Sequence, residues 1–166
     1  MTIQTNQGDR LSGGGITLLH LATAHPRTLA SMVLVSAPPC FPERARAIQR
    51  QFSPGMLVEE EMARMRARHA HGEAQLDRLF AMVRGFATSY DDVNFTPPYL
   101  GTITARTLIV FGDRDPLYPV SLACEMHEAI PRSHLWIVPN GGHGPVFLDA
   151  APAFRATAIA FLNGAL

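Results

Sequence analysis

The fold of this chain is decided by the stretch TLIVFGDRDPLYP at residues 107–119. Its first five residues form a short apolar run rich in β-branched side chains, which predicts a buried strand that ends at Gly112. The loop that follows carries Asp113 and Asp115. This pattern therefore places two carboxylates at the carboxyl end of a strand.

A second stretch, SHLWIVPNGGHGPV at residues 133–146, has the same order of a buried strand and a polar loop, but its loop carries a histidine. Leu135 to Val138 is another buried-strand run, and the following Asn-Gly-Gly is flexible enough to present His143 at the same edge of the sheet. Open α/β sheets bind ligands at this edge. We expect Asp115 and His143 to lie within hydrogen-bond reach, where the carboxylate fixes the tautomer and leaves the second ring nitrogen as a base.

Length and composition narrow the class of protein. With 166 residues and 47% hydrophobic content, the chain is long enough to form one domain spanning residues 1–166. A net charge of zero gives no electrostatic reason to bind nucleic acid or an anionic membrane. The two cysteines have no metal-ligand spacing, so we expect neither a metal nor a cofactor. A polar start and the lack of long apolar runs predict a cytoplasmic protein without a membrane partner.

The remaining elements alternate between helix and strand. The order predicts an α/β fold with a mostly parallel sheet and flanking helices. Three consecutive helical patterns without an intervening strand indicate a helical cap or lid insertion over residues 43–89. The predicted elements are a helix from about residue 16 to before Pro26, a strand at 31–35, helices at 43–52, 56–71 and 73–88, a loop at 91–104, a strand at 107–111, a helix at 119–130, a strand at 135–138 and a helix at 150–162.

Ser12 is the candidate nucleophile, and its local sequence allows two interpretations. A serine followed by Gly13 and two more glycines at a helix start is typical of an N-cap, which is the commoner case on local residues alone. The same residues also suit a strained turn between a strand and a helix that exposes a nucleophilic hydroxyl.

Three motifs in this order resemble the α/β-hydrolase superfamily, in its serine-nucleophile branch. SGGGITLLHLATAHPRTLASMVLVSAPP looks like the nucleophile elbow, the helix after it and the next strand, GDRDP looks like the acid loop, and NGGHGPV looks like the histidine loop. The resemblance runs from about Leu11 to the C-terminus. It implies a partial α/β-hydrolase fold with a cap, and it favours the elbow interpretation of Ser12.

The resemblance also assigns roles to residues. Ser12 would be the nucleophile, His143 the general base, and Asp115 the acid that orients the imidazole, whereas Asp113 would cap its own loop. The backbone N–H of Gly13 would bind the oxyanion. The implied activity is hydrolysis of an ester or related small-molecule acyl substrate through an acyl-enzyme, with carbon–carbon bond hydrolysis and perhydrolase chemistry as further branches.

The chain departs from the family pattern ahead of Ser12. Arg10 stands where the family has a glycine, and the polar run Thr5 to Asp9 replaces the expected apolar strand. Counterparts of the family's earlier strands and of its second oxyanion donor are not found before Leu11. An alternative function is therefore a catalytically impaired remnant that acts as a binding or half-fold subunit completed by another chain.

The same departure predicts an exposed sheet edge. We expect Ser31–Val35, or Thr2–Thr5 if it pairs, to present unpaired backbone groups that associate in a homodimer or with another partner. Residues 1–10 folding back as an edge strand is the weaker option, because they are polar.

Overall fold

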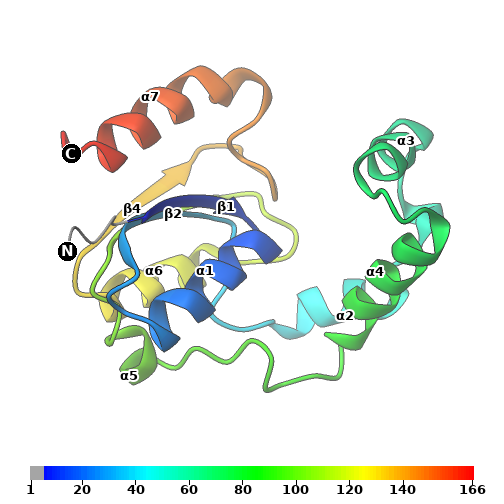
Figure 1. Cartoon of the computed structure of the whole chain (residues 1–166), viewed down its shortest axis with the longest axis horizontal. Helices are drawn as coiled ribbons and strands as arrows, with labels where there is room; N and C mark the ends of the chain where they lie inside the picture. The colour runs from blue at the N-terminus through cyan, green and yellow to red at the C-terminus, as the bar shows by residue number, and fades with distance from the viewer. Residues whose placement is uncertain (1–5) are drawn as a thin grey trace. The chain divides into compact units, whose positions relative to one another are not determined.

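The computed structural model describes residues 6–166, with side chains from Ser12 onward except that of Leu148 (Figure 1). The chain divides into two compact units. One is built from the chain up to Cys40 together with Asn94–Leu166, and the other is Phe41–Val93. The first unit holds every residue for which the sequence predicts a catalytic role.

The first unit is built around a four-stranded sheet whose neighbouring strands all pair in parallel. The strands follow one another in chain order across the sheet. They are β1 (Asn6–Leu11), β2 (Leu29–Val35), β3 (Arg106–Gly112) and β4 (Ser133–Val138). This sheet confirms the predicted α/β class.

Helices cover both faces of the sheet, as Figure 1 shows for α1 (Gly13–Ala24) and α6 (Val120–Ala129) on one face and α7 (Ala151–Leu162) on the other. Alternate strand residues point to opposite faces of the sheet, so the apolar side chains of β2 and β3 are buried on both faces. The core on the α7 side contains Val33, Val35, Leu108, Val110, Ala158 and Phe161. Two short helices, α5 (Pro97–Leu100) and a 3-10 turn at Leu148–Ala150, lie in the connections.

The prediction that a polar run at residues 5–9 replaces the strand before Ser12 is wrong for residues 6–9, whereas Thr5 lies outside the described residues. The polar residues Asn6–Leu11 form β1, which pairs in parallel with β2 from Asn6 opposite Leu29 to Leu11 opposite Val35. Backbone groups make these hydrogen bonds, so the strand pairing does not require apolar side chains in β1. The pairing also supplies partners for the backbone N–H and C=O groups of β2. Residues 6–11 are thus the edge strand that the sequence analysis considered the weaker option.

The location predicted for the exposed edge is wrong for the same reason. Ser31–Val35 pairs on both sides, with β1 and with β3. Within the described part of the chain, the outer strands of the sheet are β1 and β4. The alternative edge at Thr2–Thr5 lies outside the described residues.

The second unit is helical, as its sequence pattern predicts. It contains α2 (Glu43–Gln51), a 3-10 turn at Pro54–Met56, α3 (Glu59–Arg68) and α4 (Glu73–Gly85). Met62, Leu76 and Phe80 form its small core. That this unit acts as a cap remains a prediction.

Arg46 holds the second unit together from within. Only 3% of this residue is exposed, and its guanidinium donates to the backbone oxygens of Phe41 at 3.0 Å, Phe86 at 2.7 Å and Ser89 at 2.6 Å. It also lies 3.9 Å from the centre of the Tyr90 ring. These bonds satisfy the buried charge and connect α2 to the chain segment that follows α4. Among the described residues, no helix is both long enough and apolar enough to cross a membrane.

Candidate active site

Ser12 lies at the sharp junction of β1 and α1. Its backbone has φ 48° and ψ −116°, a left-handed conformation that costs about 1–3 kcal/mol for a residue other than glycine. Its N–H donates to the backbone oxygen of Val35 at 2.7 Å, which continues the sheet ladder into the turn. The Ser12 side chain makes no hydrogen bond that caps α1. These features match the strained turn expected of an elbow, which forms with Arg10 in the strand before it.

Asp115 lies in the loop after β3, and its side chain is completely buried. Its Oδ1 accepts the backbone N–H of Leu117 at 2.7 Å and that of Tyr118 at 3.1 Å. Its Oδ2 lies 3.0 Å from Nδ1 of His143. Both carboxylate oxygens are therefore engaged, and the carboxylate faces the imidazole in a fixed orientation.

His143 lies in the loop after β4 and joins the other two side chains. Its Nε2 lies 3.0 Å from Oγ of Ser12, and its side chain is 29% exposed. The structure thus brings together Ser12, His143 and Asp115, which are spread over 131 positions of the sequence. They meet where β1, β3 and β4 end, the edge at which parallel sheets place their ligands.

The charge on Asp115 is maintained by its partners. Burial acts to raise the pKa of this carboxyl, but the hydrogen bond to His143, the backbone N–H of Leu117, the charge of His143 and the backbone N–H of Tyr118 act in the opposite direction. The net effect lowers its pKa below the ordinary 3.8. Asp115 is therefore an acceptor of hydrogen bonds at neutral pH, and Nδ1 of His143 carries the hydrogen between them.

Two glycines allow the acid loop and the histidine loop to touch. A Cβ on Gly112 would lie 2.1 Å from the backbone oxygen of Gly141 and 2.5 Å from that of Gly142. A Cβ on Gly141 would lie 2.7 Å from the Cβ of Pro145. The contact is closed by a hydrogen bond from the Arg114 N–H to the Gly141 oxygen at 2.9 Å. The loops that carry Asp115 and His143 are thus fixed to each other through their backbones.

Gly13 is the first residue of α1, directly after Ser12. The first N–H groups of a helix have no acceptor within the helix, and the helix dipole favours negative charge there. The backbone N–H of Gly13 is thus placed to bind an oxyanion formed next to Ser12. A Cβ added at Gly13 would meet nothing within 4 Å, so an alanine would fit at this position.

The competing candidates lie elsewhere. Asp113 is exposed, and its backbone N–H donates to Val138 at 3.3 Å. Three other histidines contact structural partners, namely His20 with the Phe95 ring, His127 with the Ser133 hydroxyl and His134 with the Phe161 ring. In the described part of the chain, no group of three or more His, Cys, Asp or Glu residues is arranged to hold a metal ion.

Tyr118 is a site residue that the sequence analysis missed. It is 3% exposed, and its ring packs edge-on against His143 with the centroids 5.3 Å apart. A signal for it was present in the sequence, because Tyr118 follows Asp115 by three residues. A residue so close to Asp115 in the same loop can lie beside the imidazole that Asp115 contacts.

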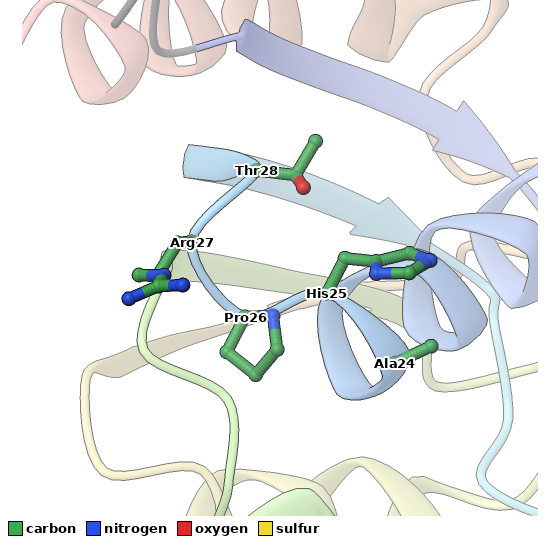
Figure 2. A pocket seen from close by; sticks show the side chains of 5 residues that line it. All are labelled: Ala24, His25, Pro26, Arg27 and Thr28. Carbon is green, nitrogen blue, oxygen red and sulfur yellow. The ribbon is translucent and has the colours of Figure 1, made fainter.

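A pocket of about 260 Å³ lies away from this site (Figure 2). It is lined by Ala24, the last residue of α1, and by His25, Pro26, Arg27 and Thr28 of the turn between α1 and β2. This turn leads into the amino end of β2. The triad, by which we mean Ser12, His143 and Asp115, lies beyond the carboxyl ends of the strands. The pocket is a hollow of one surface turn and contains no member of the triad.

Comparisons with known proteins agree with this fold. Residues 89–165 match the family described as TAP-like protein, an α/β-hydrolase family. RutD of Pseudomonas savastanoi pv. phaseolicola, a protein proposed to be a carbamate hydrolase, is 27% identical over 173 residues, which cover 90% of this chain and 64% of RutD.

Solved structures extend the likeness to nearly the whole chain. The meta-cleavage product hydrolase CumD of Pseudomonas fluorescens IP01 superposes with a TM-score of 0.73 at 20% identity, covering 99% of this chain and 66% of CumD. The 2-hydroxy-6-oxo-6-phenylhexa-2,4-dienoate hydrolase of Rhodococcus sp. strain RHA1 gives 0.69 at 17% identity, covering 96% and 64%. This chain therefore spans just under two thirds of the length of these relatives. The parallel sheet, the elbow and these matches show that the chain has the α/β-hydrolase fold.

Proposed function

We propose that this chain is a serine hydrolase that cleaves an ester or related acyl substrate. The observation that supports this most strongly is the continuous set of contacts from Ser12 Oγ to His143 Nε2 and from His143 Nδ1 to Asp115 Oδ2, each 3.0 Å long. The likeness to hydrolases in sequence and fold supports the general class of reaction. The roles of the individual residues and the substrate class are our proposal.

The first half of the reaction forms an acyl-enzyme. Ser12 Oγ attacks the carbonyl carbon of the substrate while its proton passes to Nε2 of His143. The negative charge on the carbonyl oxygen is stabilised by the backbone N–H of Gly13. When the tetrahedral intermediate collapses, the bond to the leaving group breaks and His143 returns the proton to that group.

The second half releases the acid. A water molecule gives a proton to Nε2 and attacks the acyl carbon, and the bond between that carbon and Oγ then breaks. The proton on His143 returns to Ser12, so the net reaction adds one water across the acyl bond. Asp115 stays ionised throughout and stabilises the imidazolium that forms in each half, as its lowered pKa allows.

The size and polarity of the substrate would be set by groups beyond the triad. We propose that the helical unit Phe41–Val93 contributes to a small-molecule binding site as a cap, which follows from its sequence pattern as an insertion between β2 and β3. One solved structure named above is a meta-cleavage product hydrolase, and carbon–carbon bond hydrolysis is an alternative branch to test beside esters.

Covalent labelling tests the central claim. A fluorophosphonate probe should label the unaltered chain on Ser12, because the probe reacts with serine hydroxyls that an adjacent base activates. Ser12→Ala should lose the label. Ser121→Ala, which removes an exposed serine of α6, is the matched control and should be labelled normally. Labelling that persists in Ser12→Ala would show that Ser12 is not the nucleophile.

The alternative function, a half-fold subunit completed by another chain, is favoured by the edge strand β1. In the described part of the chain, β1 pairs only with β2 and leaves its other edge without a strand. We propose that a strand from a second copy or from another partner covers this edge. Light scattering over a concentration series should show association, and hydrogen exchange should show β1 becoming protected with it. A strict monomer at high micromolar concentration with β1 already protected would contradict the proposal.

A further inference from the structure

Tyr118 contacts the acid and the base of the triad with two different parts of the residue. Its backbone N–H donates to Asp115 Oδ1 at 3.1 Å. Its ring lies edge-on to the His143 imidazole, with the ring centroids 5.3 Å apart and an interplanar angle of 67°. Tyr118 is 3% exposed and the Asp115 side chain is completely buried. One buried residue therefore links the acid to the base, by a hydrogen bond on one side and by packing on the other.

The hydrogen bond to Asp115 does not by itself fix the plane of the imidazole. The torsion that turns a histidine ring has broad energy minima, and the ring can also turn about the single contact between His143 Nδ1 and Asp115 Oδ2. The contact of Nε2 with Ser12 Oγ at 3.0 Å cannot hold the ring throughout the reaction, because Oγ becomes bonded to the acyl carbon. The orientation of the imidazole therefore requires a further restraint.

Tyr118 can supply this restraint because its own position is fixed from both sides. Asp115 Oδ1 accepts the backbone N–H groups of Leu117 and Tyr118, which closes the turn before the ring. Pro119 follows directly and is the N-cap of α6, where its backbone oxygen accepts the N–H of Leu122 at 3.1 Å. The backbone of Tyr118 is thus held between the turn of the acid loop and the first turn of a helix.

We propose that Tyr118 is a positioning residue whose ring fixes the plane of the His143 imidazole, so that Nε2 faces Ser12 Oγ. This inference rests on the proposed function of the site. Edge-to-face packing of aromatic rings favours particular angles between them, so the contact restrains the orientation of the imidazole as well as its distance. Packing of this kind is what holds catalytic side chains within roughly 0.5 Å of a productive geometry.

Two substitutions separate the ring of Tyr118 from its hydroxyl. Tyr118→Phe keeps the ring, so kcat and KM for p-nitrophenyl esters should match those of the unaltered chain. Tyr118→Leu keeps an apolar side chain but removes the ring, so the imidazole should turn away from Ser12. We expect kcat to fall by about a hundredfold with little change in KM, the result of a displacement of about 1 Å that leaves substrate binding intact.

A second pair of rings in the same unit provides the matched control. Phe161 is 1% exposed and lies edge-on to His134, with the ring centroids 5.6 Å apart and an interplanar angle of 72°. Phe161→Leu removes a buried ring from a histidine in nearly the same arrangement, but His134 takes no part in the proposed reaction. Thermal unfolding should show that both leucine variants are less stable, whereas only Tyr118→Leu should lose kcat. An equal loss of kcat in both would overturn the proposal.

Proton NMR gives a readout that does not depend on turnover. The hydrogen between His143 Nδ1 and Asp115 Oδ2 exchanges slowly with water while the imidazole is held in place. Its resonance should be visible in the unaltered chain, in Tyr118→Phe and in Phe161→Leu, and it should broaden or disappear in Tyr118→Leu. If Tyr118→Leu does not fold, Tyr118→Met fills the same space with a flexible side chain and should show the same losses.

The outcomes separate this proposal from the proposed function. If Tyr118→Leu folds and keeps both kcat and the resonance, the positioning role is wrong and the proposed hydrolase function stands. A loss of kcat in Tyr118→Phe would also overturn the role, because the hydroxyl and not the ring would then be the part that acts. If no fluorophosphonate labelling of the unaltered chain depends on Ser12, the proposed function fails, and the resonance still tests whether Tyr118 holds the imidazole.

Discussion

His143→Ala should lower kcat/KM for p-nitrophenyl esters of short acids by about four orders of magnitude or more, the size of loss seen when the base is removed from comparable triads. The physical reason is that Nε2 is the group placed 3.0 Å from Ser12 Oγ to take its proton.

His25→Ala is the matched control for this experiment. His25 is an exposed histidine in the turn between α1 and β2, at the other end of β2 from the triad (Figure 2). It should keep full activity. Activity that survives in His143→Ala at the level of the control would remove His143 from the mechanism.

Gly112→Ala should reduce both the stability of the first unit and its activity. The added methyl group would overlap backbone atoms of Gly141 and Gly142, with contacts as short as 2.1 Å, and a backbone cannot move aside as a flexible side chain can. We expect a loss of about 1–3 kcal/mol in the free energy of unfolding, typical of overpacking. The overlap can be removed only if the histidine loop, which carries His143, shifts. A displacement of about 1 Å lowers the rate by about a hundredfold, so we expect activity to fall by that factor.

Gly142→Ala is the control, since it adds the same methyl group to the same loop. A Cβ there meets nothing within 4 Å. Denaturant unfolding should show nearly unchanged stability, and ester hydrolysis should stay within a few-fold of the unaltered chain. Equal behaviour of the two variants would mean that close contact between the loops does not position His143.

Strands with continuous apolar runs were predictable from the sequence. β2 and β3 are buried on both faces of the sheet, so Ser31–Val35 and Thr107–Phe111 carry the signal of a parallel strand in their composition. β1 gives no such signal, because Asn6–Leu11 is polar and its pairing depends on the neighbouring backbone of β2. The short helix α5, within the predicted loop 91–104, was missed because a four-residue helix has almost no periodicity to detect.

Composition was enough to predict which chemistry-bearing side chains follow strands: Asp115 comes after β3 and His143 after β4. Buried strands are read from apolar composition, and a polar residue in the next loop must then lie at the sheet edge. Ser12 was ambiguous on local residues, and only the resemblance to a family favoured the elbow. Its strained φ of 48° and missing cap bond come from the connection between β1 and α1, which requires the sheet to exist.

How these groups act on one another depends on contacts that form only in the folded chain. The close approach of Gly112 to Gly141 and the contact of His143 Nε2 with Ser12 Oγ join residues that are 29 and 131 positions apart in sequence. No local propensity specifies such pairs. They arise because parallel strands end at one edge, and because burial of Asp115 forces its loop to supply the backbone N–H groups that keep the carboxylate charged.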